Sequence, residues 1–334
     1  MTITTDTLRD TLRDAMPGLL LSATIALAVR FVSDRLGGPA MLYALLFGMA
    51  FNFLTEDERF ARGIRFASRN ILRFGVALLG LRITTDEVTE LGWPVVALIV
   101  ASVVATILIG GLIGRAFGLK GDQSILSAGA VAICGASAAL AIASVLPAHK
   151  DHERNTILTV AGVTALSTVA MVVYPVFVTY LHYDNTTAGI FLGATIHDVA
   201  QVVGAGYMIS DETGEISTLV KLIRVACLVP VVITISLLMR RHRSVEFRKE
   251  PLLPWFLVAF IVLVIVNSLG WVPIPAHDFL TPVSSWCLLT AVAALGVKTS
   301  LKALVDVGPA PVGVMLLQTV FLAVFVIGGI QFIA

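Results

Sequence analysis

The stretch SILSAGAVAICGASAALAIASVLPA, residues 124–148, decides the fold of this chain. It contains no charged residue, and an apolar run of about 20 residues is long enough to cross the hydrocarbon core of a membrane as a helix. Glycines and serines interrupt the run, and Gly135 lies near its centre. The stretch therefore predicts a membrane-embedded segment whose helix is open to a break at mid-depth.

The composition of the whole chain points the same way. Of its 334 residues, 57% are hydrophobic and 13% are charged, whereas soluble proteins carry about 25% charged residues. The mean hydropathy is +0.93. Most of the outer surface is therefore expected to face lipid rather than water. The net charge of +1 excludes a strongly basic nucleic-acid-binding protein.

Further apolar runs are bounded by charge, proline or glycine, and with the central stretch they make eleven segments. At about 20 residues per span, eleven segments leave no room for a soluble catalytic domain. The sequence thus predicts one all-α polytopic membrane domain over residues 1–334, with about 11 transmembrane helices. The segments are 17–33, 38–54, 68–83, 93–115, 123–146, 155–181, 187–208, 217–239, 252–269, 279–297 and 308–333.

Lysine and arginine in the short loops predict the orientation, because cytoplasmic loops retain positive charge. Residues 59–69 hold four arginines, and residues 240–249 hold four arginines and one lysine. Both loops are expected inside, and the acidic loops at 86–90 and 211–215 are expected outside. The N-terminus is then cytoplasmic, with no cleaved signal peptide expected, and the C-terminus lies outside.

An odd number of segments divides into one N-terminal helix, 17–36, and two blocks of five, 37–183 and 184–334. The two blocks enter the membrane from opposite sides, which is typical of inverted repeats. ALLFGMAFN, residues 44–52, is similar to GIFLGATIH, residues 189–197, although chance similarity between Gly- and Ala-rich helices is an alternative. Inverted-repeat transporters place the substrate at interrupted helices near the midplane.

The motif CGAS, Cys134–Ser137, is the first candidate site. If Gly135 breaks the helix, a second half-helix begins near Ala136 and Ser137, and its free N–H groups and positive dipole end attract an anion. Cys134 and Ser137 would then be hydrogen-bonding neighbours, because no base is positioned in the sequence to activate either as a nucleophile. Close helix packing through small residues is the alternative.

Three polar residues, His197, Asp198 and Gln201, lie within five positions of the seventh segment. Such residues are costly in a membrane unless they face protein or a water-filled cavity. A histidine beside a carboxylate is suited to relay protons near neutral pH. The alternatives are an interhelical hydrogen bond from His197 and an ion pair of Asp198 with an arginine.

Cations also occur at membrane depth. Asn70 and Arg73 share one face of the third segment, and Lys221 and Arg224 are three positions apart in the eighth. If Arg73 and Arg224 turn inward, they supply positive potential for an anionic substrate, or they neutralise Asp198. Alternatively, Arg73 snorkels, with its charged end at the membrane surface. The predicted site residues are Cys134, Gly135, Ala136, Ser137, Asn70, Arg73, Gln201 and Arg224 for substrate, with His197 and Asp198 for proton or ion coupling.

Enzyme motifs such as GxxxxGK[ST], HExxH and GxSxG are absent from the sequence. The cysteines, Cys134, Cys227 and Cys287, are widely spaced in apolar runs, which fits neither a disulfide framework nor a zinc site. We therefore expect no catalytic residue, no cofactor and no metal. Any transport would be secondary, driven by a gradient rather than by ATP.

Four ordered motifs carry a family resemblance over nearly the whole chain from residue 17: RNILRFGVALLGLRIT (69–84), AICGASAALAIASVLPA (132–148), GATIHDVAQVVGAG (193–206) and AALGVKTSL (293–301). Together they resemble the YeiH-type sulfate exporter family, which is related to the bile acid, arsenite and riboflavin transporter superfamily. The resemblance implies a bacterial inner-membrane location and two inverted repeats with crossing, interrupted helices.

In the related superfamily the fourth helix of each repeat is the interrupted one. Counted from the blocks above, these are the fifth segment, with Cys134–Ser137, and the tenth, with Ala293–Lys298. The family's seventh-helix motif more often has Glu after the His, whereas this chain has Asp198. The shorter side chain keeps the carboxylate but reduces its reach.

The sequence and the resemblance together predict a secondary active transporter that exports a small inorganic anion or organosulfonate, such as sulfate, by alternating access with proton coupling. The alternatives are a sodium/proton antiporter-like protein or an organic-anion symporter on the same fold, and then a non-transporting receptor or an intramembrane enzyme. Expected partners are the anion, a coupling proton or sodium ion and the lipid bilayer, with no nucleic acid. The chain is compatible with a monomer or a homodimer.

Overall fold

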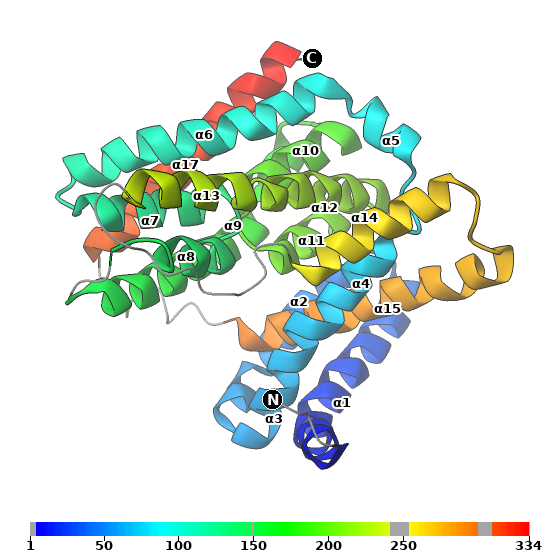
Figure 1. Cartoon of the computed structure of the whole chain (residues 1–334). Coiled ribbons are helices and arrows are strands. Elements are labelled where there is room, and N and C mark those ends of the chain that lie inside the picture. The colour runs from blue at the N-terminus through cyan, green and yellow to red at the C-terminus, as the bar shows by residue number, and fades with distance from the viewer. Residues whose placement is uncertain (1–4, 148–149, 241–253, 300–308, 334) are drawn as a thin grey trace. The chain divides into compact units, whose positions relative to one another are not determined.

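The computed structural model describes residues 5–147, 150–240, 254–299 and 309–333. Across these ranges the chain is helical and has no β-strand (Figure 1). Six helical stretches are long and apolar enough to cross a membrane: Asp14–Leu36, Gly92–Ala116, His152–Tyr180, Asp211–Met239, Ile274–Lys298 and Pro311–Ile333. The prediction of an all-helical membrane protein is confirmed at this level.

In the described residues, each of the eleven predicted apolar segments lies largely on a helix or on consecutive helices, and the number that cross a membrane stays a prediction. The helices are α1 (Thr5–Leu36), α2 (Ala40–Ala50), α3 (Glu58–Phe66) continuing through a π-helical turn η2 (Ala67–Ile71) into α4 (Leu72–Leu79), α6 (Gly92–Ala116), α7 (Gly121–Ala132) with α8 (Ala136–Ala143), α9 (His152–Tyr180), α10 (Asn185–Thr195) with α11 (Val199–Tyr207), α12 (Asp211–Ala226) with α13 (Leu228–Arg240), α14 (Trp255–Ser268), α15 (Ile274–Lys298) and α17 (Pro309–Ile333). Short connecting helices are η1 (Asn52–Glu56) and α5 (Thr85–Glu90).

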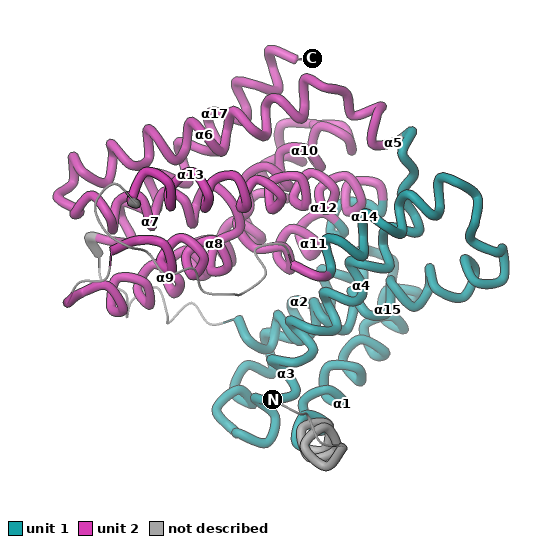
Figure 2. The backbone as a smooth tube through the Cα atoms, viewed as in Figure 1, with its two compact units in different colours: residues 1–87, 207–211, 256–300 teal, residues 88–206, 212–255, 301–334 magenta. Residues whose placement is uncertain are grey.

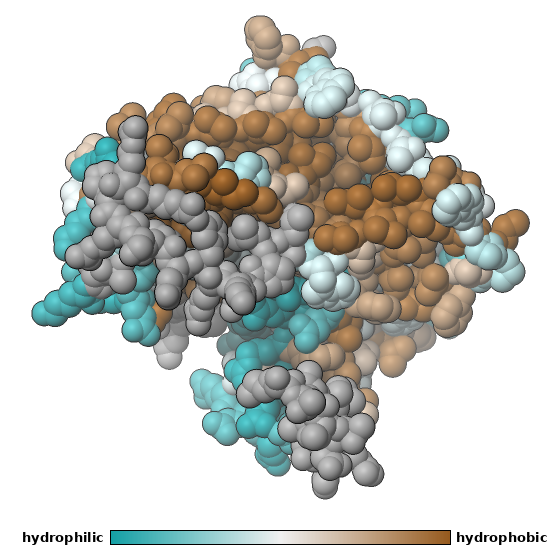
Figure 3. Space-filling model, viewed as in Figure 1, coloured by the Kyte–Doolittle hydropathy of each residue, from teal (hydrophilic) through white to brown (hydrophobic). Residues whose placement is uncertain are grey.

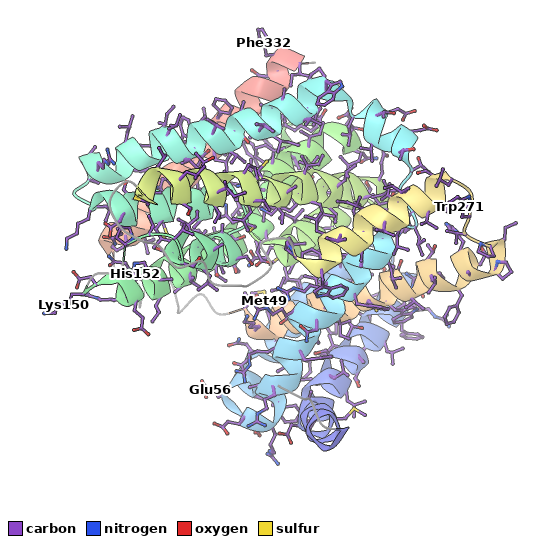
Figure 4. All side chains as sticks on the ribbon, viewed as in Figure 1. Met49, Glu56, Lys150, His152, Trp271 and Phe332 are labelled. Atoms are coloured by element: carbon purple, nitrogen blue, oxygen red, sulfur yellow. The ribbon has the colours of Figure 1, made fainter. Side chains whose placement is uncertain are left out.

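The surface of these helices is apolar where lipid is expected. Hydrophobic residues gather over α6 and α13 (Figure 3), and Leu108 and Leu112 on α6 are each 63% exposed. Trp271, between α14 and α15, and Phe332, at the end of α17, point outward (Figure 4). Exposed leucines are expected in a hydrocarbon core, and tryptophan is typical of the membrane–water boundary.

The chain forms two compact units, each built from separate stretches of sequence (Figure 2). Unit 1 comprises residues 1–87, 207–211 and 256–300, and unit 2 comprises residues 88–206, 212–255 and 301–334. Each of the two predicted blocks, 37–183 and 184–334, contributes helices to both units. The inverted-repeat layout therefore remains a prediction.

Within unit 1, α2 crosses α15 closely through two glycines. Gly48 faces the backbone of Ala293 and Val297, and Gly296 faces the backbone of Leu45. Beyond the end of α2, the side-chain amide of Asn52 donates hydrogen bonds to the carbonyls of Val297 (2.7 Å) and Thr299 (3.1 Å). These bonds satisfy carbonyl groups that the end of a helix leaves without an intrahelical donor.

The expected break in the tenth segment is wrong. α15 runs as one helix of 25 residues from Ile274 to Lys298 and includes the whole stretch from Ala293. Gly296 lies against the α2 backbone, so its missing side chain permits a close helix crossing instead of a turn. The second interrupted helix lies in the seventh segment, between Thr195 and Val199.

Unit 2 contains both interrupted helices, α7–α8 and α10–α11, together with α6, α9, α12, α13 and α17. α10 packs against α12 through Gly193, which faces the carbonyl of Ser217 and the side chain of Val220. Gly48 of α2 has the equivalent position in the similar nonapeptides, and α2 and α10 both have 11 residues. The sequence similarity thus extends to helix length and to a glycine at a helix crossing.

Replacing Gly48 with Ala is expected to destabilise unit 1. The added Cβ would meet backbone atoms of Ala293, Gly296 and Val297, and overpacking of this kind costs about 1–3 kcal/mol. The apparent melting temperature of the purified protein in detergent measures the effect. Gly328→Ala on α17 is the matched control, because no heavy atom of the described chain lies within 4 Å of its added carbon. Equal melting of the two variants would contradict the proposed packing.

Candidate functional site

The first interruption separates α7 from α8. α7 ends at Ala132, Ile133 leaves the helical region with φ −117° and ψ −85°, and Gly135 has φ +62° and ψ −121°. This mirror-image region is open to glycine and strained for residues that carry a Cβ. The break is therefore at Gly135, as the sequence predicted, and packing alone does not explain this glycine.

The second interruption separates α10 from α11. Ile196 is extended, with φ −66° and ψ 140°, and the chain resumes its helix at Val199. Asp198 caps the new helix, because its Oδ1 accepts a hydrogen bond from the Ala200 amide at 2.8 Å. The hydroxyl of Ser167 on α9 accepts bonds from the amides of His197 (3.1 Å) and Asp198 (3.0 Å). The exposed backbone of the break is thus largely satisfied from within unit 2.

Lys221 of α12 ties the two interruptions together. Its Nζ donates to the carbonyl of Ile133 at 2.7 Å and to the carbonyl of Ile196 at 2.8 Å. One ammonium group therefore bonds both breaks at once, which brings α7 and α10 together at their C-terminal ends. Lys221 is fully buried, with no exposed surface.

Arg224, one helical turn further along α12, completes the connection. Its guanidinium donates from Nε to Ala132 (2.6 Å), from Nη1 to Ile196 (3.0 Å) and from Nη2 to Val131. These acceptors are the last carbonyls of α7 and α10, where the helix dipole is negative. Both cations therefore replace the backbone donors that each helix lost at its break.

Neither cation forms an ion pair within the described ranges. No carboxylate oxygen there lies within 4.0 Å of the Lys221 ammonium or the Arg224 guanidinium. Asp198 interacts with Lys221 electrostatically but is hydrogen-bonded to the α11 backbone. The alternative in which Arg224 neutralises Asp198 by a direct ion pair is therefore wrong.

His197 is fully buried beside the first break. The Thr319 hydroxyl on α17 donates to the carbonyl of Met315 at 2.8 Å, so it accepts from His197 Nε2 at 3.0 Å. His197 Nδ1 has no hydrogen-bond partner among the described residues. The ring is therefore oriented by the bond from Nε2 to Thr319.

Gln201 is 2% exposed and lies one turn after His197. Its Nε2 donates to the Thr168 hydroxyl at 2.8 Å, and its Oε1 has no partner in the described part of the chain. Two buried acceptor atoms, one on His197 and one on Gln201, therefore remain unsatisfied close to the second break.

The two interruptions lie side by side. A Cβ built on Gly135 would lie 3.5 Å from the Cβ of His197, so α8 and α11 begin at neighbouring points. At the start of α8, Ala136 is half-buried and Ser137 is exposed, and the N-cap residue, Gly135, has no side chain with which to cap the helix. Cys134, Gly135, Ala136, Ser137, His197, Asp198, Gln201, Lys221 and Arg224 therefore all belong to one crossing inside unit 2.

Two predicted site residues belong to the other unit. Asn70 lies exposed in η2, and Arg73 stacks its guanidinium over the ring of Phe256, with 5.6 Å to the ring centroid. Both are unit 1 residues. Their inclusion in the substrate site stays a prediction.

Sequence reasoning missed the hydroxyl groups that fix the crossing. Ser167 and Thr168 of α9 and Thr319 of α17 bind the polar residues of the second break. Isolated Ser and Thr in apolar helices usually bond to their own backbone one turn earlier, so none of them stood out. In the described ranges no group of three His, Cys, Asp or Glu side chains is placed to hold a metal ion.

An all-helical membrane protein with two interrupted helices, crossed at buried polar groups, is a transporter-like protein. This chain belongs to the conserved hypothetical protein 698 family, whose model matches residues 17–315. It is 53% identical over 317 residues to a UPF0324 membrane protein of Chlorobaculum tepidum, covering 94% of this chain and 88% of the relative. It is 49% identical over 327 residues to the UPF0324 membrane protein TauZ of Paracoccus pantotrophus, covering 97% of each.

The membrane location is supported by these named relatives, which include a UPF0324 membrane protein of Rhizobium meliloti, 48% identical over 320 residues, 95% of this chain and 93% of the relative. No solved structure matches the chain. The family resemblance carried by the four sequence motifs is confirmed.

Replacing Lys221 with Met is expected to lower stability by about 1–3 kcal/mol, because the buried carbonyl of Ile133 loses its donor while Ile196 keeps Arg224. Thermal unfolding in detergent checks this. Lys120→Met is the matched control, since Lys120 is exposed and forms a surface ion pair with Asp151 at 3.4 Å. If Lys221→Met melts at the same temperature as the control, the hydrogen bonds of Lys221 to the two breaks do not stabilise the protein.

Replacing Gly135 with Ala is expected to destabilise the first break through the backbone alone. The nearest side-chain atom to the added carbon is 3.5 Å away, so space is adequate, but φ of +62° is strained for alanine. Strain of this kind costs about 1–3 kcal/mol. Gly111→Ala near the C-terminal end of α6, where no described atom lies within 4 Å of the added carbon, should not lose stability. Equal unfolding temperatures would show that the break tolerates any residue.

Proposed function

We propose that the chain is a secondary active transporter that exports a small inorganic anion or organosulfonate, such as sulfate, by alternating access with proton coupling. The observation that carries the proposal is the pair of fully buried cations, Lys221 and Arg224, at the crossing of two interrupted helices. Discontinuous helices that cross at membrane depth are typical of substrate sites in transporters. Two buried positive charges without a paired carboxylate favour an anion there.

The start of α8 is the proposed contact point for the anion. Its N-cap residue, Gly135, has no side chain with which to cap the helix, and Ser137 is exposed. A helix N-terminus offers N–H donors and a positive dipole end to an anion. The three nitrogen atoms of Arg224 already donate to carbonyls. Arg224 is therefore proposed to attract the anion through its positive potential and not through a direct hydrogen bond.

Coupling is assigned to the second break. His197 and Asp198 adjoin the start of α8 through Gly135, so a proton bound there would act on the anion at short range. A sodium/proton antiporter would instead place a cation at Asp198. The nearby charges of Lys221 and Arg224 oppose a cation, which favours the anion exporter.

The proposal includes an arrangement of eleven spans in a bacterial inner membrane, with the N-terminus in the cytoplasm and the C-terminus outside. The positively charged loops of the sequence and the two blocks of five segments support it. The assignment of Asn70 and Arg73 to substrate binding stays a prediction from the sequence.

Transport into everted membrane vesicles tests the function. Labelled sulfate or a sulfonate should accumulate with a proton gradient in vesicles that contain the protein, and Ser137→Asp should reduce uptake at least about tenfold, because the new carboxylate occupies the positive end of α8. Ser137→Asn, of equal size but neutral, is the matched control and should retain most uptake. Sodium-dependent proton movement without anion uptake would support the antiporter instead.

A further inference from the structure

The charged groups at the crossing do not sum to zero. When both are protonated, Lys221 and Arg224 together carry two positive charges, and Asp198 carries one negative charge when ionised. Among the described residues no carboxylate, Asp198 included, lies within 4.0 Å of either cation. The side chains alone therefore leave one positive charge uncompensated inside unit 2.

The helix ends do not change this sum. Each helix terminus behaves as about half an elementary charge, positive at the N-terminus and negative at the C-terminus. The C-terminal ends of α7 and α10 meet the N-terminal ends of α8 and α11, so two negative ends and two positive ends cancel. The uncompensated charge of the crossing thus stays at one positive unit.

Other titratable groups surround Asp198 or the two cations. Lys221 faces Asp198 from α12, Cys134 faces it from the first break, and Tyr174 of α9 interacts with Arg224. The thiol and the phenol are neutral in their ordinary protonated forms. None of them supplies the missing negative charge.

Of the two groups that could take up a proton, His197 and Asp198, Asp198 is the less buried. A proton on His197 would place a third positive charge next to two buried cations, at a fully buried ring. A proton on Asp198 removes a negative charge from a half-buried side chain. Protonated Asp198 raises the uncompensated charge of the crossing from one positive unit to two.

We propose that the crossing selects its anion by charge balance: a monoanion, such as a sulfonate, when Asp198 is ionised, and a dianion, such as sulfate, when Asp198 is protonated. This inference rests on the proposed function, since it takes the crossing to be the anion site. An uncompensated charge in a membrane protein costs several kcal/mol, so each loaded state is the one that brings the sum to zero.

The pairing predicts that the site couples to protons with a divalent substrate and not with a monovalent one. Sulfate enters together with a proton on Asp198, and the loaded crossing is neutral. A sulfonate enters without a proton, and the loaded crossing is again neutral. Proton movement is therefore a property of the divalent substrate.

The test measures binding of sulfate and of methanesulfonate to the purified full-length protein between about pH 5 and 8, a range in which the charges of both ligands are constant. Sulfate affinity should fall as pH rises, by up to about tenfold per pH unit once Asp198 is ionised. Methanesulfonate affinity should rise or stay level over the same range.

Asp198→Asn removes the carboxylate charge but keeps a side chain that can cap α11, because Asn also caps helices well. This variant should bind sulfate with no pH dependence and should bind methanesulfonate about tenfold or more weakly than the wild type. Asp184→Asn is the matched control, since Asp184 caps α10 by accepting from the Thr187 amide at 2.8 Å, at the opposite end of that helix. It should keep the wild-type pH profiles.

The outcomes separate the two proposals. If neither anion binds the wild type, the proposed function fails and the charge-balance inference with it. If both anions bind with the same pH dependence, the function stands and the inference is wrong. The same holds if the sulfate affinity of Asp198→Asn still depends on pH. If the pH dependence of sulfate affinity is lost in His197→Gln and kept in Asp198→Asn, the proton binds His197 and the inference is overturned.

Discussion

The bonds from Lys221 and Arg224 to the ends of α7 and α10 are the constraint on which the centre of unit 2 depends. Backbone groups in a membrane are satisfied within helices, and a break exposes carbonyls that water cannot reach. The two cations bind those carbonyls from a third helix. Without such donors neither interruption would be tolerated at depth, and the two helices would not cross at their breaks.

The four helix ends at the crossing have different partners. The C-terminal ends of α7 and α10 are bound by cations, and the N-terminal end of α11 is capped by Asp198. The N-terminal end of α8 begins at Gly135, which has no side chain with which to cap it, and Ser137 is exposed there. The cations thus bind the two C-terminal helix ends, whereas the N-terminal end of α8 carries the exposed Ser137.

The sequence located the first helix break correctly and placed the second one in the wrong segment. Gly135 was predictable, because a glycine inside an uncharged apolar run both weakens the helix and permits a positive φ. The second break was sought at Ala293–Lys298, where Gly296 instead allows α2 and α15 to approach. A glycine that turns the chain and a glycine that admits a neighbouring helix look the same in sequence. The polar residues His197, Asp198 and Gln201 marked the true second break, but periodicity alone did not distinguish it from a continuous helix.

The sequence by itself determined the membrane class, the positions of the apolar segments and the short list of polar residues at depth, because hydropathy and the cost of burying charge act along the chain. Only the tertiary structure decided the roles of those residues. Lys221 lies 88 positions from Ile133 and 25 from Ile196, yet it binds both carbonyls. Partners so distant are set by helix packing, and this packing makes Arg224 a tie between helices and Asp198 a helix cap.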